Sequence, residues 1–109
     1  MREIVLDTET TGLDYNKGDR LVEIGAIELI NHIPTGKTFH SYLNPGMDKE
    51  MPQEAFNVHG LTTEFLSNKP LFSEVVESFL SFLGESNLII HNAKFDIGFI
   101  NYELQLLEN

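Results

Sequence analysis

Two acidic residues at the end of an apolar segment have the clearest chemical potential in this sequence. Asp7 and Glu9 follow residues 4–6, an Ile-Val-Leu run typical of a buried strand. Side chains alternate along a strand, so both carboxylates project from one face, with Cα atoms roughly 6.6 Å apart. Such a pair resists desolvation unless a cation compensates its charge. We interpret it as a divalent metal site with hard oxygen ligands; the alternative is two hydrated acids at a strand end.

A third acid, Asp96, is predicted to reach the same place from far along the chain. Residues 88–90, Leu-Ile-Ile, predict a short buried strand, and Asn92 can cap the helix that follows. If this strand pairs in parallel with the first strand, Asp96 comes close to the first two acids. The alternative is an acid that is merely well placed at a helix N-terminus, worth under about 1 kcal/mol.

The N-terminal half must supply the sheet that holds these acids. Residues 21–30 and 37–43 predict a second and a third strand, separated by turn chemistry from Asn31 to Gly36. Because the connections are short, we expect an antiparallel meander of three strands.

The second predicted strand contains three residues that the alternation of buried and exposed side chains does not explain. Gly25 indicates a β-bulge or a close backbone approach. Glu23 and Glu28 are expected at the solvent face or the sheet edge, with a position near the metal site as the alternative for Glu23.

The C-terminal half predicts two amphipathic helices. Pro70 opens the first and Gly84 closes it. Its apolar face consists of Phe72, Val75, Val76, Phe79, Leu80 and Leu83. The second helix begins near residue 93, and its expected buried stripe consists of Ile97, Ile100, Leu104 and Leu107.

Residues 52–60 are expected to form a loop with a short helical turn that Gly60 ends. His59, in this segment, is either a structural histidine or a ligand contact. The residue types alone favour the structural role.

Composition narrows the class of protein. Seventeen acidic against seven basic residues give a net charge of -10, which argues against binding long nucleic acid through a basic face. It does not exclude an enzyme that holds a few nucleotides through bound metal ions. The 109 residues predict one small α/β domain over 1–109, and the absence of cysteine excludes disulfides and thiolate metal sites. Without an apolar stretch long enough to span a membrane, we expect no membrane partner and a cytoplasmic location.

Three motifs resemble the proofreading exonucleases of the DEDD superfamily, which have a ribonuclease-H-like fold. They are Ile4-Val-Leu-Asp-Thr-Glu-Thr-Thr-Gly12, Glu54-Ala-Phe-Asn-Val-His-Gly60 and Ile90-His-Asn-Ala-Lys-Phe-Asp-Ile-Gly-Phe99. The resemblance implies a mixed sheet built from the meander, a helix, a parallel fourth strand and a helix, ending before a fifth strand. It also implies a 3′-to-5′ exonuclease that releases nucleoside monophosphates from single-stranded or frayed DNA 3′ ends beside a polymerase catalytic subunit.

The resemblance assigns roles to the matched residues. Asp7, Glu9 and Asp96 match the catalytic acids that bind two Mg²⁺ or Mn²⁺ ions in two-metal phosphodiester hydrolysis. Contacts with the substrate are implied for Asp7, Glu9, Thr10, Glu54, His59, Asn92 and Phe95.

The sequence departs from the family pattern in one respect. The family's third motif, a general-base His followed by a metal-binding Asp, is not found, and none of His32, His40 and His91 matches the base. Losing a general base typically costs roughly 10²–10⁴ in rate. We therefore expect an N-terminal portion of an exonuclease domain, itself weakly active or inactive. Without a fifth strand, its fourth strand is an exposed apolar edge through which the chain is expected to self-associate.

Two other classes of function remain open on sequence grounds. A phosphatase of the haloacid dehalogenase type would use Asp7 as nucleophile with an acid two residues later, but its fold needs a parallel α/β unit after the first strand instead of a meander. A non-catalytic module would keep the fold and bind a nucleotide or a polymerase partner.

Overall fold

A four-stranded mixed sheet forms the centre of the computed structural model, which describes residues 1–46 and 50–108. Residue 109, the last of the expected 1–109 unit, lies outside the described residues. The strand order is β3-β2-β1-β4, with β1–β2 and β2–β3 antiparallel and β4 parallel to β1. The strands are β1 (Arg2–Thr10), β2 (Leu21–Ile30), β3 (Ile33–Tyr42) and β4 (Asn87–Ile89). The expected meander and the parallel fourth strand are confirmed.

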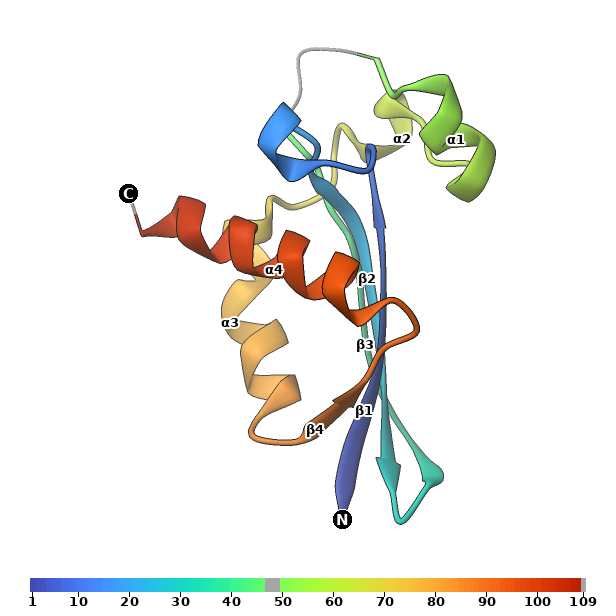
Figure 1. The fold of residues 1–109 in the computed structure, drawn as a ribbon, viewed down its shortest axis with the longest axis vertical. Helices are drawn as coiled ribbons and strands as arrows, with labels where there is room; N and C mark the ends of the chain where they lie inside the picture. Colours follow the sequence, from blue (N-terminus) through green and yellow to red (C-terminus); the bar gives the residue numbers. More distant parts are fainter. Residues whose placement is uncertain (47–49, 109) are drawn as a thin grey trace.

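The helices lie in two places, on one face of the sheet and at the end of β1 (Figure 1). They are η1 (Tyr15–Lys17), α1 (Gln53–His59), α2 (Thr63–Leu66), α3 (Phe72–Leu83) and α4 (Ala93–Leu107). Figure 1 shows α3 and α4 on the same face of the sheet, and α1 and α2 near the end at which β1 finishes. Within the described part of the chain, none of the helices has the length and apolar character needed to cross a bilayer.

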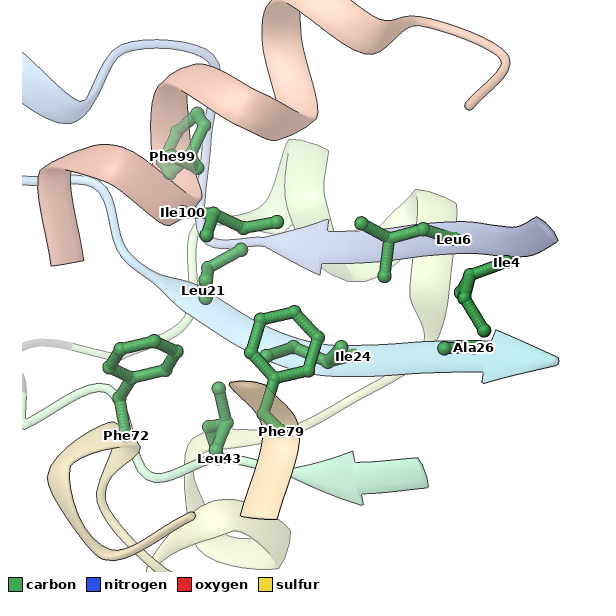
Figure 2. Packing of buried hydrophobic residues seen from close by; sticks show 10 residues of the cluster. All are labelled: Ile4, Leu6, Leu21, Ile24, Ala26, Leu43, Phe72, Phe79, Phe99 and Ile100. Atoms are coloured by element: carbon green, nitrogen blue, oxygen red, sulfur yellow. The ribbon is translucent and has the colours of Figure 1, made fainter. Parts of the chain in front are cut away.

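The main core lies between the sheet and the helices α3 and α4, and it fixes which way the β1 acids point. Figure 2 shows its packing. Ile4 and Leu6 are buried in it because alternate β1 side chains face the helices. Asp7 and Glu9 therefore face the other side of the sheet, where Asp7 is exposed and Glu9 is half-buried. The cluster consists of Ile4, Leu6, Leu21, Ile24, Ala26, Leu43, Phe72, Phe79, Phe99 and Ile100.

The connection between β2 and β3 is shorter than expected. Its turn is Asn31-His32, with φ of 51° and 69°, and β3 begins at Ile33 instead of residue 37. Two consecutive left-handed residues make the tight hairpin whose twist matches that of its strands. Pro34 and Gly36 thus lie within β3, which as an edge strand tolerates proline.

The fourth strand is not buried as the sequence predicts. It spans Asn87–Ile89 at the sheet edge, and Leu88 and Ile89 are 36% and 42% exposed. Within the described residues it pairs only with β1. The expected exposed apolar edge is therefore present.

Phe72 and Phe79 of α3 and Ile100 of α4 are buried as the apolar spacing predicts, but each helix exposes one residue of its predicted face. Leu80 of α3 and Leu107 of α4 are each 45% exposed. The buried residues of α4 include two acids, Asp96 and Glu103, beside Phe99 and Ile100. A purely apolar stripe was wrong for α4 because polar partners on the sheet side bond to these acids.

Glu28 of β2 is also buried, at 8% exposure, instead of facing solvent. Arg2 pairs with one carboxylate oxygen, and Thr35 Oγ1 donates to the other at 2.7 Å. These hydrogen bonds, with that from Arg2 the larger cause, lower the pKa of Glu28. The Arg2 guanidinium also donates to the main-chain carbonyls of Phe82 and Leu83, so it joins the sheet to the end of α3.

Candidate functional site

The two β1 acids lie beside a second pair of titratable residues on the open face of the sheet. In the strand register Asp7 is opposite Gly25, and Glu9 is opposite Glu23. His40 Nε2 lies 2.6 Å from a carboxylate oxygen of Glu23. Of the two positions considered for Glu23, the structure supports the one near the β1 acids.

Asp96 contacts the same segment of β1 from the helix side. It lies in the first turn of α4 and is 5% exposed. Thr8 Oγ1 donates a 2.9 Å hydrogen bond to Asp96 Oδ1, and Thr8 is itself buried. Because Thr8 lies between Asp7 and Glu9 in the chain, this bond ties the third acid to the strand that carries the first two.

The three carboxylates influence one another electrostatically. Burial raises the pKa of Glu9, and the charges of Asp7, Glu23 and Asp96 raise it further against a lowering by His59. Burial likewise raises the pKa of Asp96; the Thr8 hydrogen bond lowers it and the charge of Asp7 raises it. Among the described ion pairs, none joins Asp7, Glu9 or Asp96 to a lysine or arginine. The site therefore carries negative charge that none of the described lysine or arginine ion pairs neutralises.

A divalent cation fits this site by charge and by donor type. Carboxylate oxygens are the ligands that Mg²⁺ and Mn²⁺ prefer. Over residues 1–46 and 50–108, however, no three His, Asp or Glu side chains stand in a ready-formed metal-binding arrangement. Asp7, Glu9 and Asp96 are close enough to interact, but their carboxylates are not gathered around one point.

A cavity of about 610 Å³ opens next to these acids, at the end of β1. Five of the seven expected substrate contacts line it: Glu9, Thr10, Glu54, His59 and Phe95. Asp7 instead lines a neighbouring cavity of about 240 Å³, together with Thr8, Glu9, Glu23, Gly25 and His59. Asn92 lines neither of these two cavities.

His59 has both a structural contact and a place in the cavity walls. The Leu61 main-chain N–H donates to Nδ1 at 3.0 Å, so Nδ1 acts as an acceptor and Nε2 is left to donate. Nε2 lies 3.0 Å from the carbonyl oxygen of Thr10, to which it donates. The ring thus holds α1 against the end of β1 while one edge remains at both cavities.

Asn92 occupies the N-cap position of α4, but its side chain does not cap the helix. Its carbonyl oxygen accepts from the N–H groups of Phe95 and Asp96 instead. The expected side-chain cap was therefore wrong. Thr8 is the residue near the site that the sequence did not identify, since its partner is 88 residues away and no local pattern marks such a pair.

Replacing Asp96 by asparagine is expected to stabilise the fold. A carboxyl whose pKa is raised on folding binds its proton more tightly in the folded chain, so it destabilises the fold once the pH exceeds that pKa. Asp96→Asn removes this cost and keeps an oxygen for Thr8. We expect a gain of roughly 0.5–2 kcal/mol at pH 7 that shrinks as the pH falls toward the ordinary range of aspartate.

Thermal unfolding at pH 7 and pH 4 checks this. Glu77→Gln removes the same charge from the exposed side of α3 and should change stability little. A loss of stability in Asp96→Asn, or a gain that is equal at both pH values, would contradict the interpretation.

Comparison with known proteins supports the fold and the motifs together. The profile of a family described as Exonuclease matches residues 4–109. The chain is 57% identical over 108 residues to DNA polymerase III subunit epsilon of Rickettsia prowazekii, and 49% identical over 111 residues to that of Escherichia coli. These alignments cover 99% and 98% of the chain but only 46% and 45% of the relatives, so the chain spans about half their length.

Solved exonuclease structures share the same sheet and helices. The nuclease domain of 3′hExo, a DEDDh family member bound to rAMP, aligns with a TM-score of 0.80 at 17% identity, covering 98% of this chain and 60% of that one. Exonuclease X in complex with 5′ overhanging duplex DNA aligns with a TM-score of 0.69 at 25% identity, covering 86% and 51%. The expected ribonuclease-H-like α/β fold class is confirmed.

Proposed function

The chain belongs to the Exonuclease family, and from this premise we propose that it forms the metal-binding and nucleotide-binding part of a 3′-to-5′ DNA exonuclease. The observation that carries the proposal is the position of the large cavity. Glu9 lines it, and the segment of β1 that holds Asp7 and contacts Asp96 lies beside it. A nucleotide in this cavity would have its phosphate next to three acids that lack a cationic partner among the described residues.

Asp7, Glu9 and Asp96 are the residues that would hold two Mg²⁺ or Mn²⁺ ions. Each of the three would supply carboxylate oxygens as ligands, Asp7 and Glu9 from β1 and Asp96 from α4. When bound, such ions supply an activated water and stabilise the leaving oxygen in phosphodiester hydrolysis. Thr8 holds the carboxylate of Asp96 in one orientation.

The cavity walls would bind the terminal nucleotide. Phe95 offers an aromatic face to the base, while Glu54 and Thr10 offer oxygen atoms to the sugar. His59 is held by main-chain bonds on both ring nitrogens, so its edge at the cavity is fixed before a ligand arrives. Hydrolysis beside this pocket would release a nucleoside monophosphate.

We propose further that residues 1–109 form one unit that is the N-terminal portion of a longer exonuclease domain. The support is the 46% coverage of the relatives and the family's third motif, for which no match was found. Because a general base and a metal ligand would come from that motif, the chain alone should hydrolyse DNA weakly or not at all.

The proposed partners follow from the relatives. Single-stranded or frayed DNA 3′ ends are the proposed substrate, and a polymerase catalytic subunit is the proposed protein partner, as the name of the Rickettsia and Escherichia relatives indicates. Action on DNA ends beside a polymerase would place the protein in the cytoplasm.

Calorimetric titration tests the proposal. The chain is titrated with Mn²⁺, and then with deoxythymidine monophosphate in the presence and absence of Mn²⁺. We expect Mn²⁺ to bind and to strengthen nucleotide binding. Nucleotide binding that is independent of Mn²⁺ would favour a non-catalytic module, and no binding of either ligand would refute the proposed site.

Self-association through β4 is a separate expectation. Leu88 and Ile89 are partly exposed on β4, an edge strand that pairs on one side only with β1 among residues 1–46 and 50–108. Sedimentation velocity should therefore show species larger than a monomer as concentration rises. Ile89→Lys should shift them toward monomer, whereas Leu107→Lys, on the exposed side of α4, should not. A monomer at every concentration would contradict this proposal.

A further inference from the structure

Gly25 of β2 has no structural explanation within the fold. Glycine in a strand interior costs stability and usually marks a bulge, a left-handed residue or a close backbone approach. The register shifts lie elsewhere, between Glu9 and Thr10 and between Ile27 and Leu29. Gly25 is not among the glycines with positive φ, and a Cβ built on it would meet no atom within 4 Å. Both alternatives expected from the sequence, a bulge and a close approach, were therefore wrong.

The space above Gly25 belongs to the site. Its neighbours in β2, Ile24 and Ala26, are buried on the helix side, so position 25 faces the open side. Its cross-strand partner there is Asp7, and Cβ atoms of directly opposed residues lie about 4.5–5.5 Å apart. Gly25 lines the cavity of about 240 Å³ together with Asp7. A side chain at position 25 would thus stand in this cavity, next to the Asp7 carboxylate.

The other strand that flanks Gly25 leaves the same space clear. His40 is its partner on β3. The imidazole of His40 lies 2.6 Å from Glu23, the residue that is opposite Glu9. The His40 ring is therefore held toward Glu23, and the absent side chain at position 25 leaves room beside Asp7.

We infer that Gly25 is a positioning residue that keeps the space beside Asp7 open for a hydrated divalent cation and the phosphate group of the terminal nucleotide. The inference rests on the proposed function. It explains why a residue that weakens a central strand is found at the one β2 position opposite Asp7.

Gly25→Val and Gly25→Ala test the inference because they should change stability and binding in opposite directions. Valine favours the strand, so thermal unfolding should occur at an equal or higher temperature than in the parent chain. Binding of Mn²⁺ and of deoxythymidine monophosphate with Mn²⁺, measured by calorimetry, should weaken at least about tenfold in Gly25→Val, as when a partner of a metal ligand is perturbed. Gly25→Ala should show a smaller loss of affinity. A merely structural glycine would give the reverse, with lower stability and unchanged affinity.

Two further variants separate the possible outcomes. Ile27→Val changes a side chain two positions along on the same face, outside the cavity, and should bind like the parent. Parental affinity in Gly25→Val while Asp7→Ala loses Mn²⁺ would overturn the role of Gly25 alone. Parental Mn²⁺ affinity in Asp7→Ala would instead refute the proposed function. If Gly25→Val does not fold, unchanged affinity in Gly25→Ala overturns the inference.

Discussion

Replacing Asp7 with alanine is expected to abolish Mn²⁺ binding by the chain. The charge of Asp7 raises the pKa of both Glu9 and Asp96, so its carboxylate interacts with both of the other acids. Residues that hydrogen-bond to metal ligands typically contribute about 10–100-fold to affinity, so loss of a proposed ligand itself should weaken binding by more than about 100-fold. Calorimetric titration with Mn²⁺ measures the effect directly, without any need for nuclease activity.

The control for this variant must remove the same charge elsewhere. Glu85→Ala does so at an exposed position after α3. It should keep the parental affinity, because exposed charges farther apart than about 10 Å are largely screened at 0.1 M salt. Equal Mn²⁺ affinity in Asp7→Ala and the parent chain would refute the metal site. Equal losses of affinity in Asp7→Ala and Glu85→Ala would mean that Mn²⁺ is attracted only non-specifically, by the net negative charge.

The same substitution should leave the fold intact. Asp7 is exposed, and its removal relieves repulsion on Glu9 and Asp96 instead of breaking a packing contact. Residues of a binding site commonly lower the stability of the fold when the ligand is absent, and a metal ligand without its ion is such a residue. Unfolding curves of Asp7→Ala at or above the stability of the parent chain would thus accompany the loss of Mn²⁺ binding.

Local sequence patterns were sufficient to predict the features of the fold that depend on neighbouring residues or on the order of the elements. The alternation around Asp7 correctly predicts that the two β1 acids share a face opposite Ile4 and Leu6. The strand-helix-strand order correctly predicts the parallel pairing of β1 with β4. The hairpin was wrong in detail because Pro34 and Gly36 are strong turn signals, whereas no rule of composition marks Asn31-His32 as two left-handed residues.

The parts that the sequence did not predict are polar contacts between distant segments. Apolar spacing gives the packed face of a helix only when its buried residues are apolar, and α4 buries Asp96 and Glu103. The partners of these acids, Thr8 and Arg20, lie 88 and 83 residues away. One sequence contains no signal for such pairs. The two cavities likewise form between distant segments. The larger lies between the end of β1, the segment that follows it, α1 and Phe95 of α4, and the smaller lies between β1, β2 and His59.

Removing the Glu103 carboxylate is expected to have the largest effect on stability. Glu103 is 2% exposed and accepts from Arg20 Nε at 2.8 Å and Nη2 at 2.5 Å, and from the Leu21 N–H at 3.2 Å. The hydrogen bond to Glu103 raises the pKa of Arg20. Glu103→Ala leaves a guanidinium that is 30% exposed and a buried N–H without this partner. Breaking a fully buried pair costs about 3–5 kcal/mol, so we expect a loss toward the lower end of that range for this partly buried one. Since small domains have a total stability of only about 5–15 kcal/mol, much of it should be lost.

Urea unfolding followed by circular dichroism measures this effect, and two comparisons identify its cause. Glu3→Ala removes the partner of His32 from a pair in which the Glu3 side chain is 14% exposed but the His32 side chain is 82% exposed. It should cost about 1 kcal/mol or less, because solvent screens a pair with one exposed member. Combining Arg20→Met with Glu103→Leu replaces the buried pair by apolar groups and should recover much of the loss. If Glu103→Ala lowers the free energy of unfolding no more than Glu3→Ala does, the Arg20–Glu103 pair does not stabilise the fold as proposed. Glu103 holds α4 against the start of β2, and the same helix carries Asp96 and Phe95, so this ion pair also helps to position the third acid relative to the sheet.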